Sequence, residues 1–237
     1  MTRVPKPADS LQRADAAAPG SVEALYPFLY ENQPDPAQVL AQARQSTIAK
    51  AREIIDLRTE VCARSSGLLA ACAAEMVARF SAGGRLLTFG NGGSATDAAE
   101  LVSLFMYPCA DAVSLPAIGL SGDVSVLTSL ANDVGVEVVF SRQISAFGRP
   151  EDIALGLSTS GNSENLLRAF DEACRLDMLT IGISGYDGGK MAELANLDYL
   201  FVVPSSSVHR IQEAQTTVYH IMWELVSAEF SAPAVST

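Results

Sequence analysis

Short apolar runs alternate with helical patterns from residue 86 onward. The runs cover residues 86–89, 116–120, 153–157, 179–183 and 199–203. Runs of this length, separated by helices, are typical of parallel strands joined by right-handed crossovers. The pattern predicts an α/β fold in which ligands bind beyond the carboxyl ends of the strands.

Helical spacing precedes and follows the sheet pattern. Residues 37–80 place apolar side chains at helical intervals, and we expect an interruption near Ser65, Ser66 and Gly67. A further long helix is expected from about residue 208 to 230. We therefore expect a disordered tail and a short helix over 1–36, one domain over 37–232, and a tail over 233–237. The N-terminal helices are expected to pack against the sheet domain or against a partner subunit.

Composition narrows the function classes. Apolar residues make up 49% of the 237, enough for a full core. The sequence contains no run of 18 apolar residues, so we expect no membrane span. The net charge of −11 argues against direct nucleic-acid binding, which needs a basic face. The four cysteines form no C-x-x-C pair, so we expect a reduced, cytoplasmic setting.

The first predicted strand ends in a glycine-rich loop. Gly90, Asn91, Gly92, Gly93 and Ser94 open a helical pattern. A helix start offers unpaired N–H groups and a positive dipole end, and glycine lets an anion approach the backbone.

The same loop formally matches the dinucleotide motif G-x-G-x-x-A. That motif wants an acidic residue about 20 residues on, whereas Asp123 lies 33 residues beyond Gly90. No nucleotide cofactor is therefore expected. Ser94 and Asp97 also form an S-x-x-D pattern, which predicts that Ser94 caps the helix.

A second loop after the 153–157 run is rich in hydroxyls. Ser158, Thr159, Ser160 and Ser163 place four hydroxyls within six residues. A polar turn needs one or two such residues, so phosphate binding is the better interpretation. Two such loops in one domain indicate a phosphorylated polyol held from both sides.

Polar residues also mark two later positions. Asn132 and Asp133 could bind sugar hydroxyls, although a helix-terminating turn explains them about as well. On the last helix, His209, Gln212, Thr216 and His220 share one face, and histidine is readily tuned as an acid or base near neutral pH. We prefer a functional interpretation of that face to a solvated surface.

Together these motifs resemble the SIS (sugar isomerase) domain family, near the phosphoheptose isomerases and the DnaA initiator-associating protein. The resemblance rests on GNGGSATDA, STSGNS, GYDGGKMAELA and RIQEAQTTVYH. It implies a flavodoxin-like three-layer sandwich around a five-stranded parallel sheet, a homotetramer, and a phosphorylated sugar as ligand. The substrate-binding candidates are Asn91, Gly92, Gly93, Ser94, Asn132, Asp133, Ser158, Thr159, Ser160, Ser163 and Gln212.

The chain departs from the isomerase pattern on the helix after the first loop. Glu100 and Leu104 stand where the isomerases carry a His and, one turn later, a Glu, and His209 replaces an Asp. The resemblance places zinc-site residues at Gln212 and His220, so Glu100, Gln212 and His220 are the candidate zinc ligands.

Two main functions follow from this pattern. The first is a sugar-phosphate isomerase with an altered catalytic set, in which Glu100 is the base and His220 or His209 is its partner. The second is a non-catalytic sugar-phosphate-binding regulatory or assembly protein, favoured by Leu104 because an alkyl chain moves no proton. A different SIS chemistry, such as an etherase or an epimerase, is a third.

Overall fold

The computed structural model describes residues 36–108 and 112–231. The chain divides into two compact units, Met1–Lys50 and Ala51–Thr237. The expected N-terminal tail, the short helix before residue 34 and the tail over 233–237 lie outside the described residues. The domain boundaries at 37 and 232 stay predictions.

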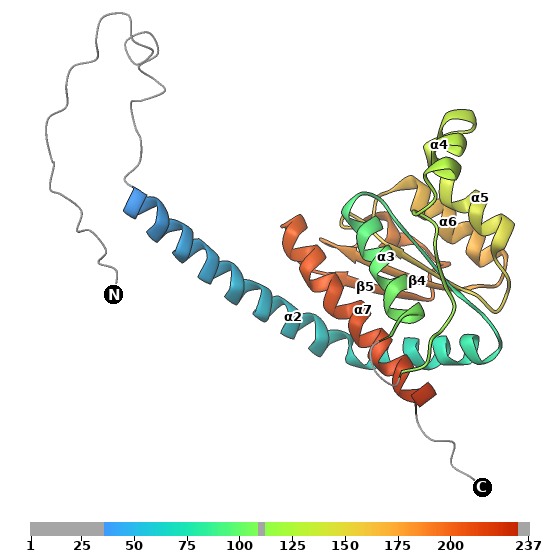
Figure 1. Cartoon of the computed structure of the whole chain (residues 1–237), viewed down its shortest axis with the longest axis horizontal. Coiled ribbons are helices and arrows are strands. Elements are labelled where there is room, and N and C mark those ends of the chain that lie inside the picture. Colours follow the sequence, from blue (N-terminus) through green and yellow to red (C-terminus); the bar gives the residue numbers. More distant parts are fainter. Residues whose placement is uncertain (1–35, 109–111, 232–237) are drawn as a thin grey trace, which may run out of the picture. The chain divides into compact units, whose positions relative to one another are not determined.

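The described chain alternates helices and strands as the pattern predicts (Figure 1). The strands are β1 (Leu86–Gly90), β2 (Ala117–Gly119), β3 (Ile153–Leu157), β4 (Leu179–Gly185) and β5 (Tyr199–Val203). The helices are α2 (Pro36–Ser81), α3 (Gly93–Met106), α4 (Val124–Asp133), α5 (Val139–Phe147), α6 (Glu164–Arg175) and α7 (Val208–Ser231), with 3-10 turns η2 (Val136–Val138) and η3 (Gly189–Glu193).

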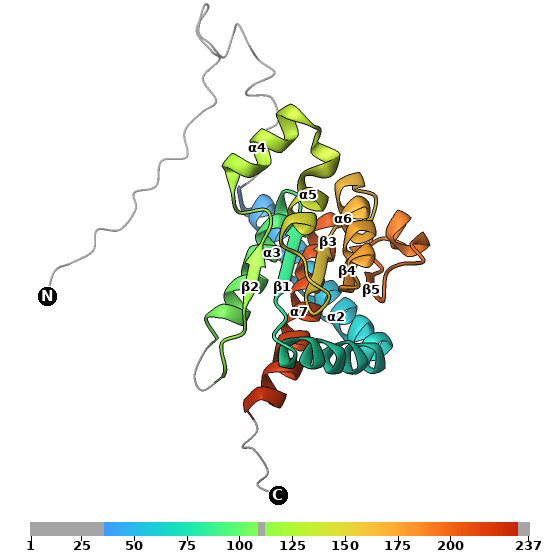
Figure 2. The ribbon, with the colours of Figure 1, turned by 90° about the vertical axis from the view of Figure 1, so that its right-hand side faces the viewer.

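The five strands form one parallel sheet in the order β2-β1-β3-β4-β5 (Figure 2). This strand order confirms the flavodoxin-like fold class. The chain moves from β1 outward to β2 and then returns to the other side of β1 for β3. Such a reversal leaves a crevice outside the carboxyl ends of β1 and β3, where ligands of doubly wound sheets bind.

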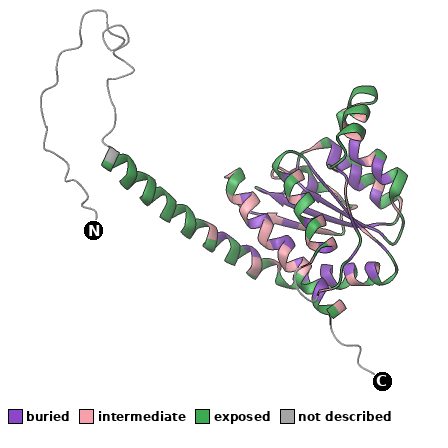
Figure 3. Cartoon of the chain, viewed as in Figure 1, coloured by how far each residue is buried: buried purple, intermediate pink, exposed green. Residues whose placement is uncertain are grey.

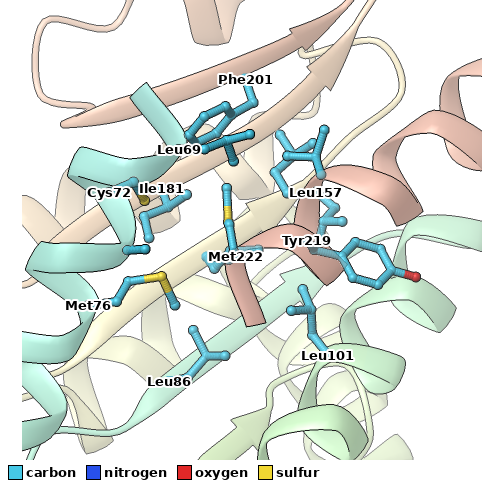
Figure 4. Packing of buried hydrophobic residues seen from close by; sticks show 14 of the residues in the cluster. Leu69, Cys72, Met76, Leu86, Leu101, Leu157, Ile181, Phe201, Tyr219 and Met222 are labelled. Carbon is cyan, nitrogen blue, oxygen red and sulfur yellow. The ribbon is translucent and has the colours of Figure 1, made fainter. Parts of the chain in front are cut away.

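Helices cover both faces of the sheet, which confirms the three-layer sandwich. One hydrophobic cluster joins the strands to α3, α7 and the part of α2 that begins at Leu57. The other joins the strands to α5 and α6. Figure 4 shows the first cluster, with Met76 from α2 and Met222 from α7 packed over Leu86 and Ile181 of the sheet.

The expected interruption near Ser65, Ser66 and Gly67 is wrong, because α2 is continuous from Pro36 to Ser81. A glycine inside a helix costs about 1 kcal/mol. Buried Val61 and Leu69 on either side continue one apolar face and offset that cost. Tertiary packing therefore overrides the local preference.

Among the described residues, one helix is long and apolar enough to cross a membrane by length and composition alone. It is α2, whose best 18-residue window has a mean hydropathy of 1.3, with 28% of that window buried. A helix that packs in a water-soluble core meets the same criteria. The buried side chains of α2, including Leu57, Cys72 and Met76, belong to the core of the sheet domain, whereas residues 37–53 are exposed (Figure 3).

Candidate functional site

The two predicted anion loops lie side by side at the crevice between β1 and β3. Gly90 pairs with Leu157 at the last step of the β1–β3 register. The first loop follows Gly90 and the second follows Leu157, so both begin at the same edge of the sheet. Sequence alone placed each loop after a strand, and the strand order makes them neighbours.

The first loop needs glycine for two separate reasons. Gly92 has a φ of 54° and immediately precedes α3, a conformation that costs other residues strain. A Cβ on Gly90 would lie 2.6 Å from the backbone oxygen of Ser94. The prediction that Ser94 caps the helix is wrong: Gly92 occupies the cap position, and Ser94 is buried in the first turn.

The second loop is held by its own hydroxyls and by the turn after β4. The Gly161 N–H donates to Ser158 Oγ at 3.0 Å, and the Asn162 N–H donates to Ser160 Oγ at 3.3 Å. The Lys190 N–H in turn donates to Asn162 Oδ1 at 3.0 Å. Ser163 stands at the cap of α6 without a side-chain capping bond, so its hydroxyl is available to a ligand.

An amide pair that sequence analysis missed joins the two loops. Asn91 Nδ2 donates to Asn165 Oδ1, and Asn165 Nδ2 donates to Asn91 Oδ1, both at 2.9 Å. Asn165 is buried in the first turn of α6. No spacing rule relates residues 91 and 165, so only the neighbouring positions of β1 and β3 could reveal the pair. It holds the two loops in one fixed arrangement.

Replacing Asn165 with alanine is expected to weaken phosphosugar binding about tenfold. Two hydrogen bonds are lost and the Asn91 amide is left without its partner, at a cost of about 1–3 kcal/mol. The measurement is the dissociation constant for a phosphosugar, by calorimetry. Asn196→Ala is the control, because it removes a side-chain amide that bonds to Asp171 instead. Equal affinities of the two variants would contradict the role of the pair.

A cleft of about 300 Å³ opens beside the first loop. Its polar lining includes Asn91, Ser121 and Asn165, and Ser121 Oγ donates to the Gly90 oxygen at 2.9 Å. The remaining lining residues are Gly90, Gly92, Ala95, Leu127, Thr128, Ala131, Val136, Val139 and Phe140.

Asn132 and Asp133 do not line this cleft. Both are exposed at the end of α4, where the Asn132 amide donates to Asp133 Oδ1 at 2.8 Å. A role for them in binding sugar hydroxyls stays a prediction. A larger cavity of about 470 Å³ between α4 and α5 is mostly apolar and is lined by neither loop, so of these two cavities the smaller one adjoins a predicted anion loop.

Helix α7 closes the site from the side of β4. A Cβ on Gly93 would lie 2.1 Å from Gln212 Nε2, so the Gln212 amide lies directly against the start of α3. Gln215, which sequence analysis missed, is fully buried, and its amide donates to the backbone oxygens of Ser158 at 3.2 Å and Ile183 at 3.4 Å. It ties the second loop to α7. Gln215 lies on the apolar face of the predicted helix, where the sequence pattern does not indicate a polar anchor.

Farther along the same two helices, Glu100, Tyr219 and His220 come together. The Tyr219 hydroxyl donates to Glu100 Oε2 at 2.7 Å, and His220 Nε2 lies 3.6 Å from Glu100 Oε1. His220 Nδ1 lies 2.8 Å from the Thr216 carbonyl oxygen. Because a carbonyl only accepts, we assign the proton to Nδ1, which leaves Nε2 able to take a proton and, once protonated, to give it.

A carboxylate that sequence analysis named only as part of a capping pattern also belongs to this group. Asp97 lies one turn before Glu100 on α3, and its Oδ2 is buried without a hydrogen-bond partner among the described residues. Burial, and then the nearby charge of Glu100, raises the pKa of Asp97 to about 6. A carboxyl group in this range can exchange protons near neutral pH.

Replacing Asp97 with asparagine is expected to stabilise the fold at pH 8. The pKa of Asp97 in the folded protein, about 6, exceeds the ordinary value of 3.8. The wild type therefore loses stability as the pH rises from about 4 to 7, and the loss is complete above that range. The gain should be about 1 kcal/mol, reduced from the full linkage value because water reaches part of the group. Urea unfolding at pH 5 and pH 8 measures it. A gain that is larger at pH 5 would contradict the assignment.

His209, the other predicted catalytic histidine, does not join this group within one chain. It is exposed in the first turn of α7. Eleven residues separate it from His220 on the helix, or about 16 Å. Its catalytic role stays a prediction.

The predicted zinc ligands do not complete a zinc site. Among residues 36–108 and 112–231, no three His, Cys, Asp or Glu side chains are grouped to hold a metal ion. Glu100 Oε2 already accepts the Tyr219 hydroxyl, and Gln212 would be the third donor. Structural and catalytic zinc sites take three or four His, Cys or carboxylate ligands, so this donor set does not fit zinc.

Comparison with known proteins agrees with the fold. Residues 51–185 match the SIS domain. A phosphoheptose isomerase from Aquifex aeolicus is 47% identical over 148 residues, which cover 61% of this chain and 75% of that protein. The phosphoheptose isomerase from Desulfovibrio desulfuricans is 42% identical, over 75% of this chain and 84% of that protein.

Solved structures give the same result. A phosphoheptose isomerase from Neisseria gonorrhoeae superposes with a TM-score of 0.73 at 34% identity, over 78% of this chain and 99% of that one. One from Francisella tularensis gives 0.74 at 30% identity, over 78% and 98%. With the doubly wound sheet and both anion loops in place, the chain belongs to the SIS domain family.

Proposed function

We propose that this protein is an aldose–ketose sugar-phosphate isomerase with an altered catalytic set. The observation that carries the proposal is the placement of the Glu100–His220 pair on α3 and α7, the two helices that meet at the first loop. The pair lies seven residues from the start of α3, or about 10 Å along its axis. A sugar whose phosphate lies at the loops would extend toward it. The relatives named phosphoheptose isomerase support the same class of reaction.

In this mechanism the two loops grip the phosphate far from the reacting carbons. Backbone N–H groups at the starts of α3 and α6, together with the hydroxyls of Thr159 and Ser163, face the anion. The phosphate then fixes the position of the carbonyl end, so that binding energy is used for orientation.

Proton transfer is assigned to Glu100 and His220. Glu100 removes the proton from the carbon that bears the hydroxyl, while His220, protonated on Nε2, donates that proton to the carbonyl oxygen, and an enediol forms. Glu100 then returns its proton to the former carbonyl carbon, and Nε2 takes the proton of the other hydroxyl, whose oxygen becomes the new carbonyl. Zinc stays an expectation from the resemblance, and no step here depends on it, since the donor set does not complete a site.

One observation favours a second candidate, a binding protein without turnover. Leu104 stands where the related enzymes carry a carboxylate, and its half-buried side chain packs against the core cluster of α2, α3 and α7. A binding protein of this kind would keep the phosphate loops and have no use for a second carboxylate on α3.

The test is turnover of a phosphosugar panel that includes sedoheptulose 7-phosphate, with and without added zinc and with a chelator. Conversion of at least one panel member, detected by NMR of the sugar, supports the isomerase. Saturable binding without conversion of any member supports the second candidate. Absence of both binding and turnover would overturn both.

We also propose a homotetramer in the cytoplasm, assembled through the long helices. Ile55 and Leu68 of α2 are 62% and 41% exposed, and a groove of about 380 Å³ runs between α2 and α7 beside Ala70 and Leu225. A second copy of the chain would cover these apolar surfaces. Light scattering of the purified protein measures the assembly, and a monomer at micromolar concentration would contradict it.

A further inference from the structure

We propose that Tyr219 is a positioning residue that holds Glu100 in place for proton transfer. In this way Glu100 takes over the carboxylate function that Leu104 cannot supply. The inference rests on the proposed isomerase function, and it assigns a role to a residue that the sequence motifs left unassigned.

Tyr219 is itself held rigidly. Its ring is fully buried in the cluster that contains Leu101 and Met222, and it stacks on the His220 ring with a centroid distance of 5.1 Å. Figure 4 shows the hydroxyl oxygen at the end of the ring that points away from this cluster. A side chain with two rotatable bonds, packed in this way, places its hydroxyl at one fixed position.

Glu100 needs such an anchor. Its side chain is 45% exposed, so without a partner it would occupy several rotamers. The hydrogen bond from Tyr219 at 2.7 Å fixes Oε2, and the other oxygen, Oε1, then faces His220 Nε2. The tyrosine thus selects the one rotamer that brings the base and its partner together.

The hydroxyl is suited to act as a permanent donor. Burial raises the pKa of Tyr219 well above its ordinary value, and the bond to Glu100 also raises it. Tyr219 therefore stays protonated throughout the pH range of an assay. The other acceptor near this hydroxyl, Thr216 Oγ1, lies at 3.4 Å, farther than Glu100 Oε2 at 2.7 Å, so Glu100 is the better-placed acceptor of its proton.

A double-mutant cycle with Tyr219→Phe and Glu100→Gln tests the proposal. Phenylalanine keeps the buried ring and removes the hydroxyl alone. We expect Tyr219→Phe to lower kcat about tenfold while KM changes less than twofold, because only the alignment of the base is lost. In the Glu100→Gln background the same change should have almost no further effect, since two residues that act as one unit are not additive. Because these variants are expected to have low activity, their proton abstraction is followed by exchange of the substrate C–H proton in D2O, which detects slow turnover.

Tyr199→Phe is the matched control. Tyr199 also donates to a glutamate, Glu75 Oε1 at 3.0 Å, but it lies on β5 and contacts α2. Removal of the Tyr199 hydroxyl should leave kcat unchanged, although the melting temperature should fall at least as far as in Tyr219→Phe.

The outcomes separate this inference from the function on which it rests. Additive losses in the cycle, or an unchanged kcat in Tyr219→Phe, would overturn the positioning role while leaving the isomerase intact. A wild-type protein that converts no phosphosugar and exchanges no C–H proton would overturn both. An equal loss of activity in Tyr199→Phe and Tyr219→Phe would show that the loss comes from lower stability, and it would overturn the inference.

Discussion

Glu100→Gln and His220→Ala are each expected to lower kcat for the phosphosugar by about 10²–10⁴-fold. Glutamine has the size of glutamate but cannot accept the proton from carbon. Alanine at position 220 removes the imidazole that faces Glu100 Oε1. Neither residue belongs to the phosphate loops, so KM should change by only a few fold. Steady-state kinetics with the substrate found in the panel measures both constants.

The control for this pair is Glu224→Gln. Glu224 is exposed on α7 one turn beyond His220, so the same loss of charge occurs outside the site. Its kcat should equal that of the wild type. Retained turnover in His220→Ala, combined with loss in His209→Ala, would move the acid/base role to the first turn of α7 and contradict the assignment made here.

Gly161→Ala is expected to abolish measurable phosphosugar binding and to destabilise the fold by about 3 kcal/mol or more. Gly161 has a φ of 66°, which side-chain-bearing residues adopt only with strain. A Cβ there would also lie 1.9 Å from the backbone oxygen of Gly188. Because that contact is with backbone, no side chain can rotate away. The second loop and the turn after β4 would have to separate.

Gly83→Ala separates strain from site geometry. Gly83 has a φ of 86°, but a Cβ would meet no atom within 4 Å, and the residue lies in the turn before β1. It should cost about 1 kcal/mol and leave binding unchanged. Urea unfolding and calorimetric titration with the phosphosugar compare the variants. Wild-type affinity in Gly161→Ala would show that the second loop does not grip the ligand.

Most of the fold could be predicted from local sequence patterns. The spans predicted for β3 and β5 coincide with the observed ones, and the other strands differ by one or two residues at their ends. Short apolar runs bounded by glycine and polar turns depend on near neighbours in the chain, so local rules reach them. The expected break in α2 failed because contacts of Val61 and Leu69 with the core outweigh the local cost of Gly67.

Part of the candidate site could also be predicted from local sequence patterns, whereas the rest depends on contacts between residues far apart in the chain. Both anion loops were found from composition and spacing, since glycine and hydroxyl clusters after a strand have a chemical meaning of their own. Asn165, Gln215 and Tyr219 were missed because each acts on a residue more than 50 positions away. Asp97 was read as part of a capping motif, whereas burial beside Glu100 raises its pKa.

The amino-acid sequence by itself determined the alternation of strands and helices and the glycine-rich and hydroxyl-rich loops that follow β1 and β3. Only the tertiary structure decided that these loops are neighbours joined by an amide pair, and that Tyr219 brings Glu100 to His220. The physical reason is the range of the interactions. Backbone conformation and helix periodicity depend on adjacent residues, whereas hydrogen bonds between α3, α6 and α7 exist only after the sheet has set the distances between them.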